Sequence, residues 1–135
     1  KAKGVQPEKG IVSMEAYYDV FEEMQNRFGF KYIATSLRES YGASRNGWQA
    51  LLYNGRNFFH SKRYEIDIID RLGGGDAFSA SLIYALLKKK SEQEAVEFAS
   101  AASALKQTIP GDFNLSTIEE IELLAAGDES GRVIR

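Results

Sequence analysis

A first helix is predicted over residues 14–28, because apolar residues recur there with the spacing of one helical face. These residues are Tyr17, Val20, Phe21, Met24 and Phe28. Ser13 stands at the N-cap position, and Gly29 is expected to end the helix in a left-handed conformation. A turn is expected over residues 7–10, and a strand over residues 30–37. A helix followed at once by a strand is typical of layered α/β proteins.

The middle of the chain predicts strands joined by short connections. Residues 41–47 are polar and small, which indicates a loop. Two short strands follow over residues 48–53 and 56–60, and the Asn-Gly pair at residues 54–55 predicts a hairpin between them. Residues 64–70 are rich in β-branched side chains and are expected to form a further extended segment.

The last part of the chain predicts three helices. Residues 77–87 are apolar on nearly every side, which is typical of a buried helix. Ser91 and Glu94 have the spacing of a capping box, and the helix that they open is expected over residues 92–107. Its alanines allow close packing against a neighbouring element. After a Pro-Gly break, residues 116–125 are expected to form a final short helix.

Composition narrows the class of protein only a little. The 135 residues suit one domain, and 44% hydrophobic with 27% charged residues is ordinary globular usage. A net charge of −2 gives no reason to expect a nucleic acid or an anionic membrane as a binding partner. There is no cysteine, which excludes disulfides and thiolate metal sites and agrees with a cytoplasmic protein. No apolar run reaches the roughly 20 residues of a membrane span.

The most informative motif is the sequence D-R-L-G-G-G-D-A-F at residues 70–78. A glycine run lets the backbone turn sharply with its N–H groups in one concavity, and a helix N-terminus adds further unsatisfied N–H groups. Together they predict an anion site, for which phosphate is the usual ligand. Asp76 at its rim would repel a phosphate, so it suggests a base that takes a proton from an attacking hydroxyl. The alternative is that Asp76 only caps the helix.

Competing motifs are incomplete. Residues 42–47 have the glycine spacing of a P-loop, but Trp48 and Gln49 replace the Lys and Ser/Thr that would bind phosphate and magnesium. Phe78 stands where the dinucleotide-binding motif needs a small residue. His60 is the only histidine, so a site with several histidine ligands is excluded.

Residues 70–78 resemble the C-terminal signature of the ribokinase-like, phosphofructokinase-B type carbohydrate kinases, usually D-T-x-G-A-G-D-x-F. The resemblance continues through S-L-R-E-S at residues 36–40, N-G-W at 46–48 and T-I-P-G-D-F at 108–113. Within that family these segments are most similar to the 2-keto-3-deoxygluconate kinases. The likeness covers nearly all of this chain but only the C-terminal part of such a kinase.

The resemblance implies an α/β fold with a doubly wound, mainly parallel sheet. Residues 1–135 would form the C-terminal part of a single ribokinase-like domain, without the upstream part that carries the lid and most of the sugar pocket. Gly74 replaces the usual alanine and keeps the geometry of an anion hole. Arg71 replaces the usual threonine, and it either adds a cation near the phosphates or makes a local salt bridge.

The resemblance also implies roles for individual residues. Asp76 would be the general base and contact the substrate. Gly73, Gly74 and Gly75 would form the anion hole. The ATP site would include Ser36, Leu37, Arg38 and Ser100. For Arg38, a contact with phosphate or substrate and a surface ion pair with Glu39 are both open. A small residue at Ser100 either leaves room for adenine or serves packing alone, and no residue of this segment is assigned to a metal.

The function implied is ATP-dependent phosphorylation of a primary hydroxyl, with 2-keto-3-deoxygluconate converted to its 6-phosphate. The alternatives are another sugar, such as fructose or ribose, and a non-catalytic nucleotide-binding module of the same fold. ATP and Mg²⁺ are the cofactors implied, whereas a monovalent cation and a homo-oligomer are left open. The expected partners are a sugar acid, ATP and the N-terminal remainder of the chain, and residues 1–135 alone are expected to be inactive.

Overall fold

The structure is a computed structural model that describes residues 5–6, 11–12, 14–40 and 45–127. Its main sheet has four strands, β3 (Ile33–Ser40), β4 (Arg45–Tyr53), β5 (Phe58–His60) and β6 (Tyr64–Asp67). A separate antiparallel pair near the N-terminus is formed by β1 (Val5–Gln6) and β2 (Ile11–Val12).

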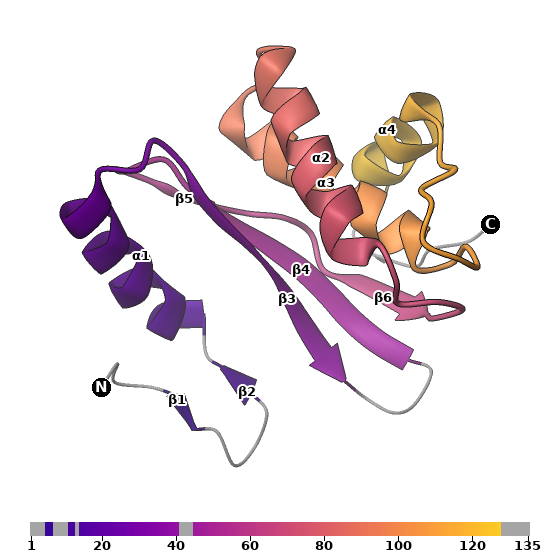
Figure 1. Cartoon of the computed structure of the whole chain (residues 1–135), viewed down its shortest axis with the longest axis horizontal. Coiled ribbons are helices and arrows are strands. Elements are labelled where there is room, and N and C mark those ends of the chain that lie inside the picture. Colours follow the sequence, from indigo (N-terminus) through magenta and orange to yellow (C-terminus); the bar gives the residue numbers. More distant parts are fainter. Residues whose placement is uncertain (1–4, 7–10, 13, 41–44, 128–135) are drawn as a thin grey trace.

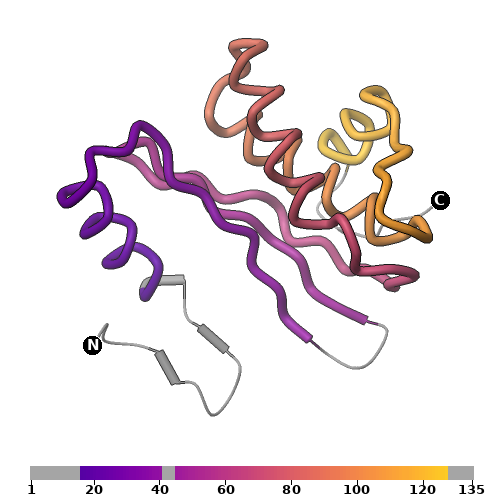
Figure 2. The backbone as a smooth tube through the Cα atoms, viewed as in Figure 1, coloured from indigo at the N-terminus to yellow at the C-terminus, as the bar shows by residue number. Residues whose placement is uncertain are grey.

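The central strand β4 sets the direction of its neighbours. It pairs with β3 along one edge and with β5 and β6 along the other, always antiparallel. Since β3 and β6 both run opposite to β4, they point the same way, and their carboxyl ends lie at one end of the sheet. Residues 68–73, which lead from β6 into the next helix, leave the sheet at that end, at the lower right of Figure 2.

Helices cover both faces of the sheet. Figure 1 shows α1 (Met14–Phe28) on one side and α2 (Gly74–Leu87), α3 (Glu92–Lys106) and α4 (Ile118–Ala126) on the other. Because successive side chains of a strand point to opposite faces, β4 serves two cores. Leu51 and Tyr53 pack with Phe21 of α1, whereas Ala50 and Leu52 belong to the core under α2 and α3.

Helix α3 is the most deeply buried of the described helices. Its alanines at 95, 99, 101, 102 and 104 are fully buried, which confirms that they serve close packing. Helix α2 is different from the prediction of a helix buried all round. Phe78 and Leu82 are buried, but Ile83 and Leu87 are 58% and 77% exposed, because α2 packs against α3 and the sheet with one face only.

The α/β class is confirmed, and the differences from the sequence lie in pairing and boundaries. All described strand pairs are antiparallel, because β3, β5 and β6 each run opposite to β4, whereas a mainly parallel sheet was expected for the family fold. Strand β4 begins at Arg45, inside the predicted loop, because residues 45–47 pair with β6 and residues 46–47 also pair with β3. Strand β5 begins at Phe58 and β6 ends at Asp67, each shorter than predicted.

Several local predictions are confirmed. Gly29 has φ 67°, and its N–H donates to Gln25 O at 2.8 Å, as expected for a left-handed helix end. Ser91 and Glu94 form the predicted capping box. At the hairpin, Asn54 Oδ1 accepts the N–H of Asn57 at 2.8 Å. The turn expected over residues 7–10 and the cap at residue 13 lie outside the described residues.

Two global properties follow from the described part of the chain. None of its helices has the length and apolar character needed to cross a membrane. It also contains no group of three or more His, Cys, Asp or Glu residues placed to hold a metal ion.

Candidate functional site

The glycine turn is shaped by a close contact with the loop after α3. Gly73 is the N-cap of α2 and has φ 75°, in the left-handed region that favours glycine. A methyl group built on Gly73 would lie 2.2 Å from Asp112 O. No side chain fits at this position, so the glycine is required both by its backbone conformation and by its neighbour.

The start of α2 offers open N–H groups. The N–H of Ala77 donates to Gly73 O at 2.8 Å, and that of Gly74 lies 3.5 Å from Arg71 O. Within the described residues, no hydrogen-bond acceptor is found for the N–H groups of Gly75 and Asp76. These are donors of the first helical turn, at the positive end of the helix dipole, so they are suited to an anion.

Asp76 lies within the helix and is exposed. Because α2 begins at Gly74 and its N-cap is Gly73, the alternative in which Asp76 caps the helix is wrong. Among the described residues its carboxylate has no hydrogen bond or ion pair. A free carboxylate beside two open N–H groups combines a proton acceptor with an anion-binding surface.

Helix α3 and its C-cap residue hold the glycine turn through hydrogen bonds. Ser103 is buried, and its hydroxyl donates to Gly74 O at 2.7 Å. Gln107 O accepts the N–H groups of Ile69 and Asp70, at 2.9 and 3.2 Å. The first residue of α2 and the segment that precedes the glycines are therefore both attached to α3.

Asp70 joins the glycine turn to the loop after α3. Its carboxylate accepts the N–H of Leu72 at 3.0 Å and the N–H of Gly111 at 2.9 Å. These two hydrogen bonds and, to a smaller extent, the charge of Lys106 lower the pKa of Asp70. The sequence marks Asp70 only as the first residue of the motif, and its bridging role depends on a contact 41 residues along the chain.

Strand β3 brings two of the predicted ATP-site residues to the face that carries α2 and α3. In the strand register Ser36 is opposite Ala50 and Arg38 is opposite Trp48, and both partners belong to the core under α2 and α3. Leu37 points to the opposite face, where α1 lies. Of the three, Ser36 and Arg38 thus share a face with the glycine turn.

Arg38 is exposed, and the ion pair expected as its alternative role is not formed. Glu39 instead accepts from Nε and Nη2 of Arg63, at 3.1 and 3.0 Å. Neighbouring residues of a strand point to opposite faces, so Arg38 and Glu39 diverge. Among the described contacts, the Arg38 guanidinium has no acidic partner, and a contact with phosphate or substrate stays a prediction.

Ser100 is buried in α3 and anchors that helix to the sheet. Its hydroxyl forms a hydrogen bond with the hydroxyl of Ser61 at 2.9 Å, and Ser61 Oγ also accepts the N–H of Ala50 at 2.8 Å. This is the packing role that the sequence left open. A contact between Ser100 and adenine stays a prediction.

Polar atoms for which the sequence predicted no role are buried on the face of the sheet that carries Arg38. Trp48 and Tyr64 form one cross-strand row with Arg38, and Asn46 lies on the same face. Both amide atoms of Asn46, Trp48 Nε1 and the Tyr64 hydroxyl have no partner among the described residues. Burial raises the pKa of Tyr64, with a contribution from Glu97, so its hydroxyl stays protonated.

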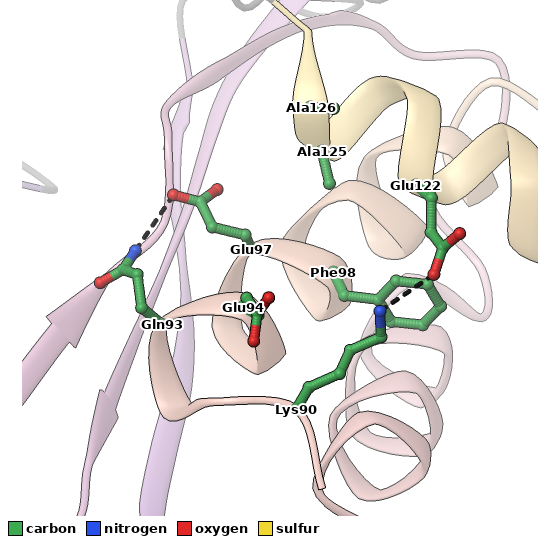
Figure 3. A pocket seen from close by; sticks show the side chains of 8 residues that line it. All are labelled: Lys90, Gln93, Glu94, Glu97, Phe98, Glu122, Ala125 and Ala126. Carbon is green, nitrogen blue, oxygen red and sulfur yellow. Dashed lines mark hydrogen bonds and ion pairs between the residues drawn. The ribbon is translucent and has the colours of Figure 1, made fainter. Parts of the chain in front are cut away.

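A separate groove of about 340 Å³ lies between α3 and α4. Lys90 Nζ lies 2.9 Å from Glu122 Oε1, and Gln93 is hydrogen-bonded to Glu97; Figure 3 draws both contacts. Its charged side chains already have hydrogen-bond or ion-pair partners, and Lys90 Nζ lies 5.7 Å from the centre of the Phe98 ring. None of the predicted site residues lines this groove, so we distinguish it from the glycine turn.

Comparisons with known proteins agree with the motif. The sequence profile described as pfkB family carbohydrate kinase matches residues 46–117, more than half of the chain. The 2-dehydro-3-deoxygluconokinase of Thermotoga maritima has a similar structure, with a TM-score of 0.82 and 46% identity over 85% of this chain. A PfkB family carbohydrate kinase of Listeria grayi has a TM-score of 0.77 and 30% identity over the same share.

A curated relative is the 2-dehydro-3-deoxygalactonokinase of Haloferax volcanii, which is 30% identical over 61% of this chain. The chain spans 26% of that protein and 35% of each of the two solved structures. It therefore corresponds to about a quarter to a third of these relatives.

The contacts at the turn predict opposite effects for two alanine substitutions. Gly73→Ala should lower the free energy of unfolding by about 2 kcal/mol or more, because it combines a left-handed backbone with the contact to Asp112. Gly75→Ala has no atom within 4 Å of the new methyl group and should raise it by up to about 1 kcal/mol. Denaturant unfolding measures both, and equal stability of the two variants would contradict this account.

The pKa of Asp70 predicts a specific pH dependence of stability. A carboxyl group with a lowered pKa in the folded state stabilises the fold above its unfolded pKa of about 3.9, and this contribution is lost as the pH falls through the folded value. The Asp70→Asn variant should therefore lose less stability than the wild type below about pH 4. Thermal unfolding across the acid range measures this, and identical pH profiles would show that Asp70 contributes nothing.

Proposed function

Because the chain belongs to the pfkB family of carbohydrate kinases, we propose that it supplies the phosphate-binding and acid–base part of an ATP-dependent sugar kinase. The observation that carries the proposal is the free carboxylate of Asp76 beside the open N–H groups of Gly75 and Asp76. Phosphoryl transfer to an alcohol needs both an anion site for the transferred group and an acceptor for the hydroxyl proton.

The proposed chemistry assigns these tasks to neighbouring groups. The N–H groups at the start of α2 stabilise the negative charge on the transferred phosphoryl group, together with the backbone of Gly73 and Gly74. Asp76 orients a primary hydroxyl of the sugar and accepts its proton as the new O–P bond forms and the bond between the γ-phosphorus and the bridging oxygen of ATP breaks, which releases ADP. The carboxylate remains able to do so because no described residue pairs with it.

For the nucleotide, we propose that Ser36, Leu37, Arg38 and Ser100 contribute to the ATP site. Support comes from the position of Ser36 and Arg38, on the face of the sheet that carries α2 and α3. A guanidinium can bind phosphate oxygens through two parallel hydrogen bonds, so Arg38 would contact phosphate or the sugar acid. The described residues contain no cluster of carboxylate or histidine side chains suited to Mg²⁺.

The proposed substrate is a 2-keto-3-deoxy sugar acid, with 2-keto-3-deoxygluconate and its 6-phosphate product first. The similarity to the Thermotoga maritima gluconokinase and the Haloferax volcanii galactonokinase supports this class. Fructose or ribose as substrate, or a module that binds nucleotide without catalysis, are the alternatives. The free Asp76 favours catalysis, because a module without chemistry gains nothing from an acid at an anion site.

We further propose that residues 1–135 act as the C-terminal part of one ribokinase-like domain in the cytoplasm. The upstream part would complete the sugar pocket, so the activity assays below use the kinase with that part included. Relative rates with the gluconate and galactonate forms of the sugar acid, fructose and ribose would decide among the substrates.

Asp76→Asn tests the proposed role of the carboxylate. Asparagine keeps the shape but accepts a proton poorly, so turnover should fall by roughly 10² or more while the affinity for ATP is kept. Steady-state kinetics with sugar and ATP, and calorimetric titration with ATP, measure the two quantities. Asp19→Asn is the matched control, because Asp19 is exposed on α1 at the opposite face of the sheet.

If Asp76→Asn turns over sugar at close to the wild-type rate, Asp76 is not the proton acceptor. A wild-type enzyme that binds ATP but phosphorylates none of the four sugars would favour the non-catalytic module instead.

A further inference from the structure

Lys106 is a buried charge that the proposed chemistry does not use. It is the last residue of α3 and is 0% exposed. Lysine is almost never fully buried unless its ammonium group is paired, because removing the charge from water is costly. A lysine in the last turn of a helix is ordinarily solvated, so its burial here calls for a specific contact.

The Lys106 side chain lies next to the glycine turn. Its Nζ donates to Ile109 O at 3.1 Å, in the loop after α3. Its Cε would be 3.2 Å from a methyl group built on Gly73. The same loop supplies Asp112 O, which approaches Gly73 from the same side. The ammonium group therefore holds the loop that fixes the shape of the turn.

Asp70, whose charge is opposite to that of Lys106, also connects the glycine turn to the loop after α3. Its carboxylate accepts N–H groups from Leu72, just before the glycines, and from Gly111, in the loop. The positive charge of Lys106 acts on this carboxylate. A neutral side chain of similar length at position 106 would leave the carboxylate without that charge, and would leave Ile109 O without its donor.

We propose that Lys106 is a positioning residue for phosphoryl transfer, whose fixed ammonium group holds the glycine turn in its anion-binding shape. The inference rests on the proposed function of the turn and adds a residue to it. Lys106 touches neither nucleotide nor sugar in this account. It acts through Ile109, Asp112 and Gly73 on the N–H groups of Gly75 and Asp76.

The charge can be separated from the packing of the side chain. Lys106→Met keeps most of the shape but removes the ammonium group. Lys106→Ala leaves a cavity into which propylammonium fits, because it has the three carbons and the ammonium group that are lost. 1-Propanol offers nearly the same shape without a charge.

The experiment compares these variants in the kinase with its upstream part, by turnover, KM for ATP and thermal unfolding. Lys106→Met should lower kcat by about 10-fold to 100-fold, since small displacements of a catalytic site have effects of this size. Propylammonium should restore at least a tenth of the lost rate in Lys106→Ala, and 1-propanol should not. Lys90→Met is the control, because Lys90 pairs with Glu122 at the groove in Figure 3.

Wild-type turnover in Lys106→Met, or equal rescue by 1-propanol, would overturn the proposal. If Lys106→Met does not fold, refolding of Lys106→Ala with propylammonium becomes the measurement, and failure to recover turnover then counts against it. If the wild type itself transfers no phosphate, the proposed function fails. The role of Lys106 is then decided by whether propylammonium, and not 1-propanol, restores the affinity of Lys106→Ala for ATP.

Discussion

The candidate site depends on the close approach of α3 and its following loop to the start of α2. Small side chains let α3 lie against its neighbours, and Ser103 then reaches Gly74 O at 2.7 Å. The loop after α3 comes so near to Gly73 that only glycine fits. The turn is therefore shaped by its packing, and the open N–H groups of α2 result from that shape.

The direction of the strands adds the second half of the site. Both β3 and β6 run opposite to β4, so their carboxyl ends lie together, at the end of the sheet where the glycine turn begins. The register opposite Trp48 places Arg38 on the face that carries α2 and α3. Residues separated by more than thirty positions thus lie toward one end of the sheet on either side of one central strand, which supports the proposed anion site.

Local signals in the sequence predicted the elements well, and tertiary contacts explain where they failed. Gly29 ends α1 and Ser91 caps α3 through contacts within one turn of backbone, so both roles could be predicted from the local sequence. The helix α2 begins three residues before the predicted start, because contacts from α3 stabilise glycines that have low helix propensity. The ion pair considered between Arg38 and Glu39 does not form, because neighbouring residues of β3 point to opposite faces of the sheet.

The supporting residues of the site were not predictable in the same way. Lys106 has the position of an ordinary solvated lysine at a helix end, and only the loop that covers it makes it buried. Asp70 was visible in the motif, but its bond to Gly111 joins segments far apart in the chain. A sequence motif identifies the groups that face a ligand more readily than those that hold them in place.

The central claim is that the start of α2 binds the transferred phosphoryl group through its backbone N–H groups. Amide resonances of residues 73–76, followed by NMR while a non-hydrolysable ATP analogue is added, test it most directly. The account predicts that Gly75 and Asp76 shift more with the ATP analogue than with AMP, whereas Gly55 in the β4–β5 hairpin does not respond. Unchanged Gly75 and Asp76 resonances at saturating nucleotide would contradict it.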